Sequence, residues 1–146
     1  MKIKKLDELQ IIKRGNIFKH CLFTIIGLLL LYLVLLESDI VLMSQRNAIA
    51  LIILIVVSMF CVKMICYGIY PLSEKRQRFI YLFMGLAGLF IIIISSRDVI
   101  SNETRFIENE MLSDAGAGII MGGLILLIFF AYIIKSVHSK MRGESL

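Results

Sequence analysis

Long apolar runs alternate with short polar segments along the whole chain. Four of these runs are long enough to cross a bilayer, because about 20 helical residues at about 1.5 Å each span a hydrocarbon core of about 30 Å. The predicted membrane helices cover residues 17–36, 48–70, 79–96 and 115–134. The pattern therefore predicts an all-α fold in which residues 1–146 form a single integral membrane four-helix bundle.

Glycines interrupt the apolar pattern in the third and fourth runs. Gly118 and Gly122 lie four residues apart, on one face of the last predicted helix, and small residues let a second helix backbone approach closely. The predicted helix-packing residues are Gly85, Gly88, Gly116, Gly118, Gly122 and Gly123. The partner of this face is either another helix of the same chain, which we favour, or a second protein.

The N-terminal segment, residues 1–16, mixes basic and apolar side chains. Apolar residues three apart among lysines predict a short amphipathic helix on the cytoplasmic membrane surface, attracted by anionic headgroups. Gly15 and Asn16 are expected to end it before the first membrane helix. The alternative is a basic flank that only sets the orientation of the chain.

Polar residues between the runs predict how the other helices begin and end. Pro71 is expected to end the second membrane helix, because it lacks the amide donor that a helix interior needs. Asp114 is expected to cap the N-terminus of the fourth helix. Within residues 104–112, Ile107 and Met111 lie four apart, which predicts a short amphipathic helix on the membrane surface.

Lysine and arginine gather in alternate polar segments. Twelve of the 16 lie before residue 20, between residues 72 and 78, or after residue 134. Because basic loops stay in the cytoplasm, this predicts a protein of the cell membrane with both termini inside (N-in/C-in) and a cytoplasmic tail at residues 135–146. The basic residues expected at the inner membrane interface are Lys63, Lys75, Arg76, Arg78 and Lys135.

Lys63 lies within the second predicted helix, toward its cytoplasmic end. Its long aliphatic stem favours a side chain that reaches along the helix to place the ammonium group in water. A buried partner or a ligand contact is the alternative.

Composition changes this picture little. The 146 residues are 59% hydrophobic, and the mean hydropathy of +0.89 is too high for a soluble domain. The net charge of +5 does not indicate nucleic-acid binding, because no basic run interleaved with aromatic residues occurs outside the membrane flanks.

Groups able to do chemistry are scattered along the chain. The three cysteines lack the spacing of metal ligands, and the two serines near the end of the third helix have no histidine beside them and are expected to bond the helix backbone. These residues are Cys21, Cys61 and Cys66, the histidines His20 and His138 at membrane ends, and Ser95 and Ser96. The sequence predicts no enzyme activity, no metal, no cofactor and no small-molecule substrate.

The acidic outer loop, residues 97–114, is the longest polar stretch between helices. Its residues considered for partner binding are Asp98, Glu103, Glu108 and Glu110. Their spacing lacks the alternating ligands and central glycine of a calcium loop. A solvated acidic surface is the favoured interpretation, and capture of a cation or a basic peptide is the alternative.

Residues 6–10, Leu-Asp-Glu-Leu-Gln, follow a group of lysines and precede the first membrane run. This element resembles one in small, mostly uncharacterised four-helix membrane proteins of Gram-positive bacteria. Those proteins carry a Leu-Asp-Glu-Arg-Gln-like element just inside the membrane and are frequently encoded beside helix-turn-helix regulators; Leu9 stands where they have arginine. The resemblance implies a cytoplasmic segment that binds and restrains a soluble regulator, with Asp7, Glu8 and Gln10 as contact residues.

The resulting hypothesis is a non-catalytic membrane protein that acts as a regulatory or accessory partner of another protein. Expected partners are membrane lipids and either a protein partner or further copies of the same chain. An immunity or defence protein against a pore-forming peptide, toxin or phage is the second hypothesis. A small channel or transporter subunit is the third, and it is disfavoured because no charged residue lies mid-membrane.

Overall fold

The computed structural model describes residues 8–38, 40–69, 74–101, 105–108 and 111–141. Within these ranges it contains four helices, each with a segment long and apolar enough to cross a membrane. They are α1 (Glu8–Glu37), α2 (Gln45–Cys66), α3 (Glu74–Ile100) and α4 (Asp114–Met141). The prediction of an all-α chain with four such helices is confirmed.

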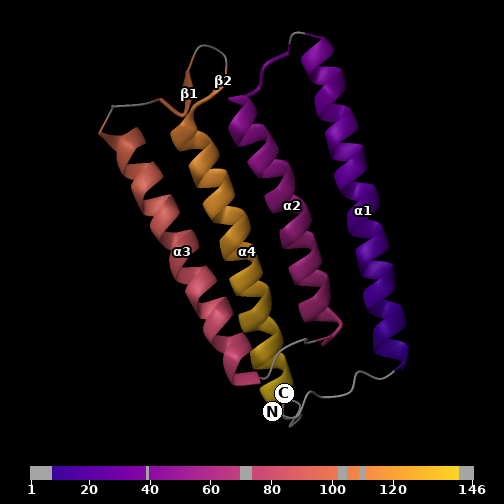
Figure 1. Cartoon of the computed structure of the whole chain (residues 1–146). Coiled ribbons are helices and arrows are strands. Elements are labelled where there is room, and N and C mark those ends of the chain that lie inside the picture. Colours follow the sequence, from indigo (N-terminus) through magenta and orange to yellow (C-terminus); the bar gives the residue numbers. More distant parts are fainter. Residues whose placement is uncertain (1–7, 39, 70–73, 102–104, 109–110, 142–146) are drawn as a thin grey trace.

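The four helices lie side by side in the order α3, α4, α2, α1 (Figure 1). Helices that follow one another in sequence run in opposite directions, so that α2 and α4 are parallel neighbours. The contact between α3 and α4 is the most extensive, and that between α1 and α2 is the smallest of the three. Helix α1 is therefore held to the other helices mainly through α2.

Helix α1 begins well before the predicted membrane segment. It runs without interruption through Gly15 and Asn16, so the prediction that these residues end a separate helix is wrong. A glycine inside a helix costs only about 1 kcal/mol relative to alanine. Ile17, two residues after Gly15, is buried against α2. Packing thus outweighs the weak local signal. Residues 1–7 of the predicted amphipathic segment lie outside the described residues.

Helix α2 ends at Cys66, before Pro71, because Gly68 takes a positive φ of 66°. The amide of Ile69 donates to the Met64 carbonyl at 3.0 Å, and that of Gly68 donates to the Ile65 carbonyl at 3.1 Å. These two bonds form a Schellman motif, which satisfies the last carbonyls of a helix. Met64 and Ile69 also pack together in the buried core between α1 and α2. The prediction that Pro71 ends this helix is wrong.

The segment before α4 contains two short antiparallel strands, β1 (Ile107–Glu108) and β2 (Met111–Leu112). The predicted amphipathic helix at residues 104–112 is therefore wrong. Spacing of four residues does not separate a single helical turn from a tight hairpin, and an isolated helix this short is unstable in water. The hairpin instead gains backbone partners from another part of the chain, since Leu112 N–H donates to the Leu42 carbonyl at 2.8 Å.

Candidate functional site

One carboxylate joins two helices at the acidic end of the molecule, which is the end that contains Glu37 and Asp114. The Asn47 amide donates to Asp114 Oδ1 at 2.7 Å, and Ser44 Oγ lies 3.5 Å from the same oxygen. Asp114 is the first residue of α4, where a negative charge interacts favourably with the helix dipole. These contacts join the beginnings of α2 and α4, which are 67 residues apart in sequence.

The N-terminal cap of α4 is Ser113 instead of Asp114. The buried Ser113 hydroxyl accepts a hydrogen bond from the Gly116 amide at 3.1 Å, which is the usual pattern of a serine cap. The prediction of Asp114 as the cap is wrong by one residue. Its carboxylate is thereby left to accept the bond from α2.

The β1–β2 hairpin connects the start of α4 to the segment between α1 and α2. Leu112 forms an isolated parallel bridge with Met43 in addition to its bond to Leu42. Gly116 lies beneath the hairpin: a Cβ atom there would come within 2.7 Å of the Phe106 carbonyl oxygen. This glycine therefore permits loop packing, whereas the sequence suggested helix packing.

Four of the predicted packing glycines lie where α3 and α4 meet. Gly88 and Gly122 face each other, because a Cβ on either would come within 3.1 Å of the other's carbonyl oxygen. A Cβ at Gly85 would meet the Phe129 ring at 2.7 Å. A Cβ at Gly118 would collide with the Ser95 hydroxyl, and Ser95 is buried there. The glycine face thus meets another helix of the same chain.

Gly123 does not belong to this face. A Cβ atom at this position would meet nothing within 4 Å. Successive helical residues are about 100° apart, so Gly122 and Gly123 do not both face α3. The close approach of α3 and α4 depends on Gly85, Gly88, Gly118 and Gly122. The rings of Tyr81 and Tyr132 also stack between these helices, with centroids 4.6 Å apart.

The predicted acidic contact residues are only partly described. Asp98 is half-buried near the end of α3, and the backbone of Glu108 forms part of β1. Glu103, Glu110 and Asp7 lie outside the described residues, as does the side chain of Glu108. At the start of α1, Glu8 is exposed and Gln10 is half-buried.

The opposite end of the molecule is basic. Lys135 Nζ on α4 lies 3.5 Å from the Cys66 carbonyl at the end of α2, where a cation complements the helix dipole. Lys13 Nζ on α1 lies 5.8 Å from the centroid of the Tyr67 ring, within range of a cation–π contact. Lys63 is half-buried, and Arg76 and Arg78 are exposed at the beginning of α3. The side chain of Lys75 is not described.

Nucleophilic and metal-binding side chains form no group of three within the described part of the chain. Cys21 is buried, Cys61 is half-buried and Cys66 is exposed, and each is a free thiol. Among the described residues, no three His, Cys, Asp or Glu side chains are grouped as metal ligands would be. The most clearly organised parts of the molecule are thus its two polar ends and the helix contacts between them.

Sequence reasoning missed several residues that organise the acidic end. Asn47 and Ser44 are separated from Asp114 by most of the chain, and nothing in their own spacing identifies that partner. Ser113 carried a usable signal, because it lies two residues before the fourth apolar run and serine is as good a cap as aspartate.

The chain matches no protein-family model, no curated protein and no solved structure. The resemblance at residues 6–10 therefore stays a prediction.

Proposed function

We propose that this is a non-catalytic, multi-pass protein of the cell membrane, with both termini in the cytoplasm, that acts as a regulatory or accessory partner of another protein. Four helices of sufficient length and apolarity support the membrane location. The orientation is supported by the separation of charge, since Lys13, Lys63 and Lys135 lie toward one end and Asp114 toward the other.

The observation that carries the proposal is the continuity of α1. Its 30 residues form one helix that joins Glu8 and Gln10 at the basic end to Glu37 at the acidic end, a span of about 45 Å. Only Ile17 and Cys21 of this helix are buried. A helix with one main neighbour and little buried surface is able to shift or tilt without disrupting the α3–α4 contact.

The acidic end provides a way to act on α1. The hairpin is bonded to Leu42, and the Ile40 amide donates to the Leu35 carbonyl at the end of α1, at 3.1 Å. If α1 has two positions, a ligand that binds the hairpin more tightly when α1 is in one of them increases the population of that position. The cytoplasmic beginning of α1 then moves with the rest of the helix, and its affinity for a docked partner changes.

The test is affinity capture of the tagged full-length chain from its native host in mild detergent, with quantitative mass spectrometry. The expected result is a stoichiometric cytoplasmic partner that is lost when Glu8 is replaced by lysine. Glu37→Lys makes the same charge change at the other end of α1, and it is expected to keep the partner bound. A partner captured equally by both variants, or no partner at all, contradicts the proposal.

A further inference from the structure

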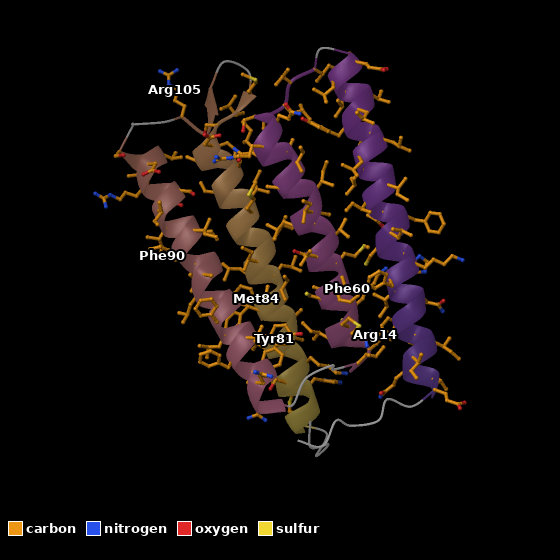
Figure 2. All side chains as sticks on the ribbon, viewed as in Figure 1. Arg14, Phe60, Tyr81, Met84, Phe90 and Arg105 are labelled. Carbon is orange, nitrogen blue, oxygen red and sulfur yellow. The ribbon has the colours of Figure 1, made fainter. Side chains whose placement is uncertain are left out.

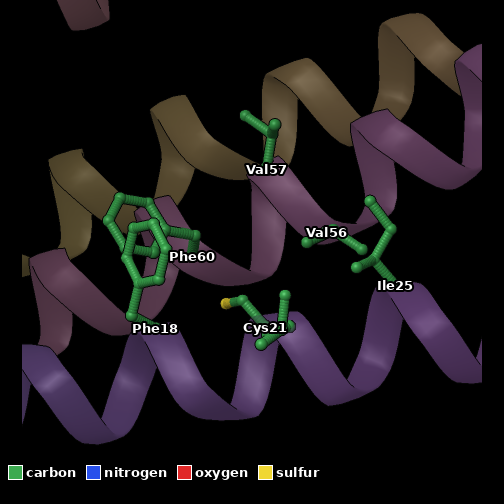
Figure 3. A pocket seen from close by; sticks show the side chains of 7 residues that line it. Phe18, Cys21, Ile25, Val56, Val57 and Phe60 are labelled. Carbon is green, nitrogen blue, oxygen red and sulfur yellow. The ribbon is translucent and has the colours of Figure 1, made fainter.

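An apolar groove runs between α1 and α2 (Figure 3). Its volume is about 220 Å³, and every residue that lines it is apolar or a cysteine: Phe18, Cys21, Leu22, Ile25, Val56, Val57 and Phe60. At one end Phe18 and Phe60 line the groove and make an edge-to-face contact, with ring centroids 5.9 Å apart. Along α1 the groove extends over about 10 Å, from Phe18 to Ile25.

The shape of the groove suits one extended hydrocarbon chain. Its volume is below the range of about 300–1,000 Å³ that is typical of enclosed sites for drug-sized ligands. It is open along one side. In a bilayer such a surface faces lipid, so an acyl chain is able to enter it from the side.

Two basic residues continue the groove at its aromatic end. Arg14 precedes Phe18 by one helical turn, and Lys63 follows Phe60 by three residues, so each lies on the groove-lining face of its helix. Because α1 and α2 are antiparallel, the two positions meet at the same end. Figure 2 places Arg14 between α1 and α2, below Phe60.

The two helices that form the groove supply no negative charge to this pair. Residues 9–36 of α1 contain no aspartate or glutamate, and neither does α2. The remaining acid on this end of α1, Glu8, precedes Arg14 by six residues and lies on a different part of the helix surface. An anionic group located between Arg14 and Lys63 therefore complements an otherwise unbalanced charge.

We propose that this groove binds one anionic phospholipid of the cytoplasmic leaflet, with an acyl chain along the Phe18–Ile25 face and the phosphate between Arg14 and Lys63. The site rests on the membrane insertion and orientation proposed above, but it does not depend on a protein partner. A bound lipid would add contacts between α1 and α2, which form the smallest of the three main helix contacts. The lipid thereby stabilises one position of α1.

The experiment uses native mass spectrometry of the delipidated full-length protein. The probes are phosphatidylglycerol and phosphatidylcholine with identical acyl chains. Phosphatidylglycerol is expected to bind in preference, and the double variant Arg14→Gln, Lys63→Gln is expected to reduce that preference on the order of tenfold. Arg97→Gln with Arg105→Gln removes the same charge from the opposite end and is expected to leave it unchanged. Equal loss in both pairs overturns the site.

A second pair of variants tests the acyl groove without changing charge. Val57 lines the groove, whereas Ile53 lies one turn away on α2 outside it, and the two side chains are similarly exposed at 41% and 51%. Val57→Trp is expected to fill the groove and weaken binding of both lipids, while Ile53→Trp leaves binding intact. Unchanged binding in Val57→Trp contradicts the proposed position of the chain.

Flotation of the same preparations with vesicles of phosphatidylcholine and phosphatidylglycerol measures insertion separately. Protein that inserts but shows no effect of Arg14 and Lys63 refutes the lipid site alone. Protein that fails to insert refutes the membrane location as well. Capture of a cytoplasmic partner is independent of both readouts.

Discussion

The Asn47 amide nitrogen lies 2.7 Å from the Asp114 carboxylate, and this bond fastens the first turn of α2 to the first turn of α4. The two residues immediately precede different predicted apolar runs, 48–70 and 115–134. At the acidic end, a polar hydrogen bond joins α2 to α4. Between α3 and α4, glycines without side chains allow the two helix backbones to approach closely.

Removal of the Asn47–Asp114 bond is expected to destabilise the fold by about 1 kcal/mol, less than the roughly 1.5–3 kcal/mol typical of a hydrogen bond to a charged group. The exposure of Asp114 keeps the effect small. The measurement is the free energy of unfolding in detergent for Asn47→Ala, Asp114→Ala and the double variant. The two single effects are expected to add to more than the double effect, because both remove the same bond. Strict additivity would show that the bond contributes nothing.

Asp98→Asn serves as the control for that series. Asp98 is also a carboxylate near the acidic end, but the bond described for it involves its backbone carbonyl, which accepts from the Ser101 hydroxyl at 3.3 Å. The substitution keeps that bond. Its unfolding free energy is expected to stay close to that of the unaltered protein.

Alanine at Gly118 is expected to destabilise the α3–α4 contact by about 1–3 kcal/mol, because its methyl group would overlap the buried Ser95 hydroxyl. Gly123→Ala is the matched control: it introduces the same methyl group on the same helix into open space. That variant is expected to be neutral or slightly more stable, since alanine favours helix. Thermal unfolding in detergent measures both.

The collision at Gly118 also predicts a rescue. Ser95→Gly removes the overlapping side chain, so the double variant Ser95→Gly, Gly118→Ala is expected to recover part of the stability lost by Gly118→Ala. No recovery would mean that the Ser95–Gly118 contact is not the cause of the loss.

Alanine at Gly68 is expected to cost about 1–2 kcal/mol, because the position has φ of 66° and a Cβ disfavours the left-handed region. Nothing lies within 4 Å of a Cβ there, so the cost is conformational alone. Asparagine tolerates this region better, and Gly68→Asn is expected to lose less. Gly15→Ala, in the interior of α1 and equally open, is expected to lose no stability. Equal losses at both glycines would exclude the conformational explanation.

The number of helices followed from the sequence because each helix contains one long apolar run. Their lengths did not follow, because α1, α3 and α4 extend beyond the predicted segments 17–36, 79–96 and 115–134. The ends of the helices did not follow in the same way. Gly68 ends α2 through a backbone motif that involves Met64 and Ile69, whereas Pro71 only forbids further helix. Ser113 and Asp114 are both good capping residues, so the sequence does not distinguish them. In the structure Ser113 caps α4, while Asp114 accepts the long-range bond from Asn47.

The pattern of apolar and polar residues did not predict the contacts between segments that are distant in sequence. Leu112 bonds to Leu42 across 70 positions of sequence, so the periodicity of residues 104–112 carried no information about it. The glycine face was partly predictable: the spacing of Gly118 and Gly122 selects one side of α4. The same helical geometry places Gly123 on a different side of α4, in agreement with the open space around it. The groove between α1 and α2 could not be predicted, because it depends on the relative position of two helices, and residue spacing within one helix does not give that position.

The proposed orientation predicts opposite reactivity at the two ends of α1. The test uses single cysteines in a chain with Cys21→Ala, Cys61→Ala and Cys66→Ala. Ser38 follows the acidic end of α1 and Leu9 lies in its first turn at the basic end, and both are exposed. A membrane-impermeant maleimide is expected to label Ser38→Cys in intact cells, because the acidic end faces outward. Leu9→Cys is expected to react only after the membrane is permeabilised. The reverse pattern would place the termini outside, and labelling of both positions in intact cells would contradict a membrane crossing by α1.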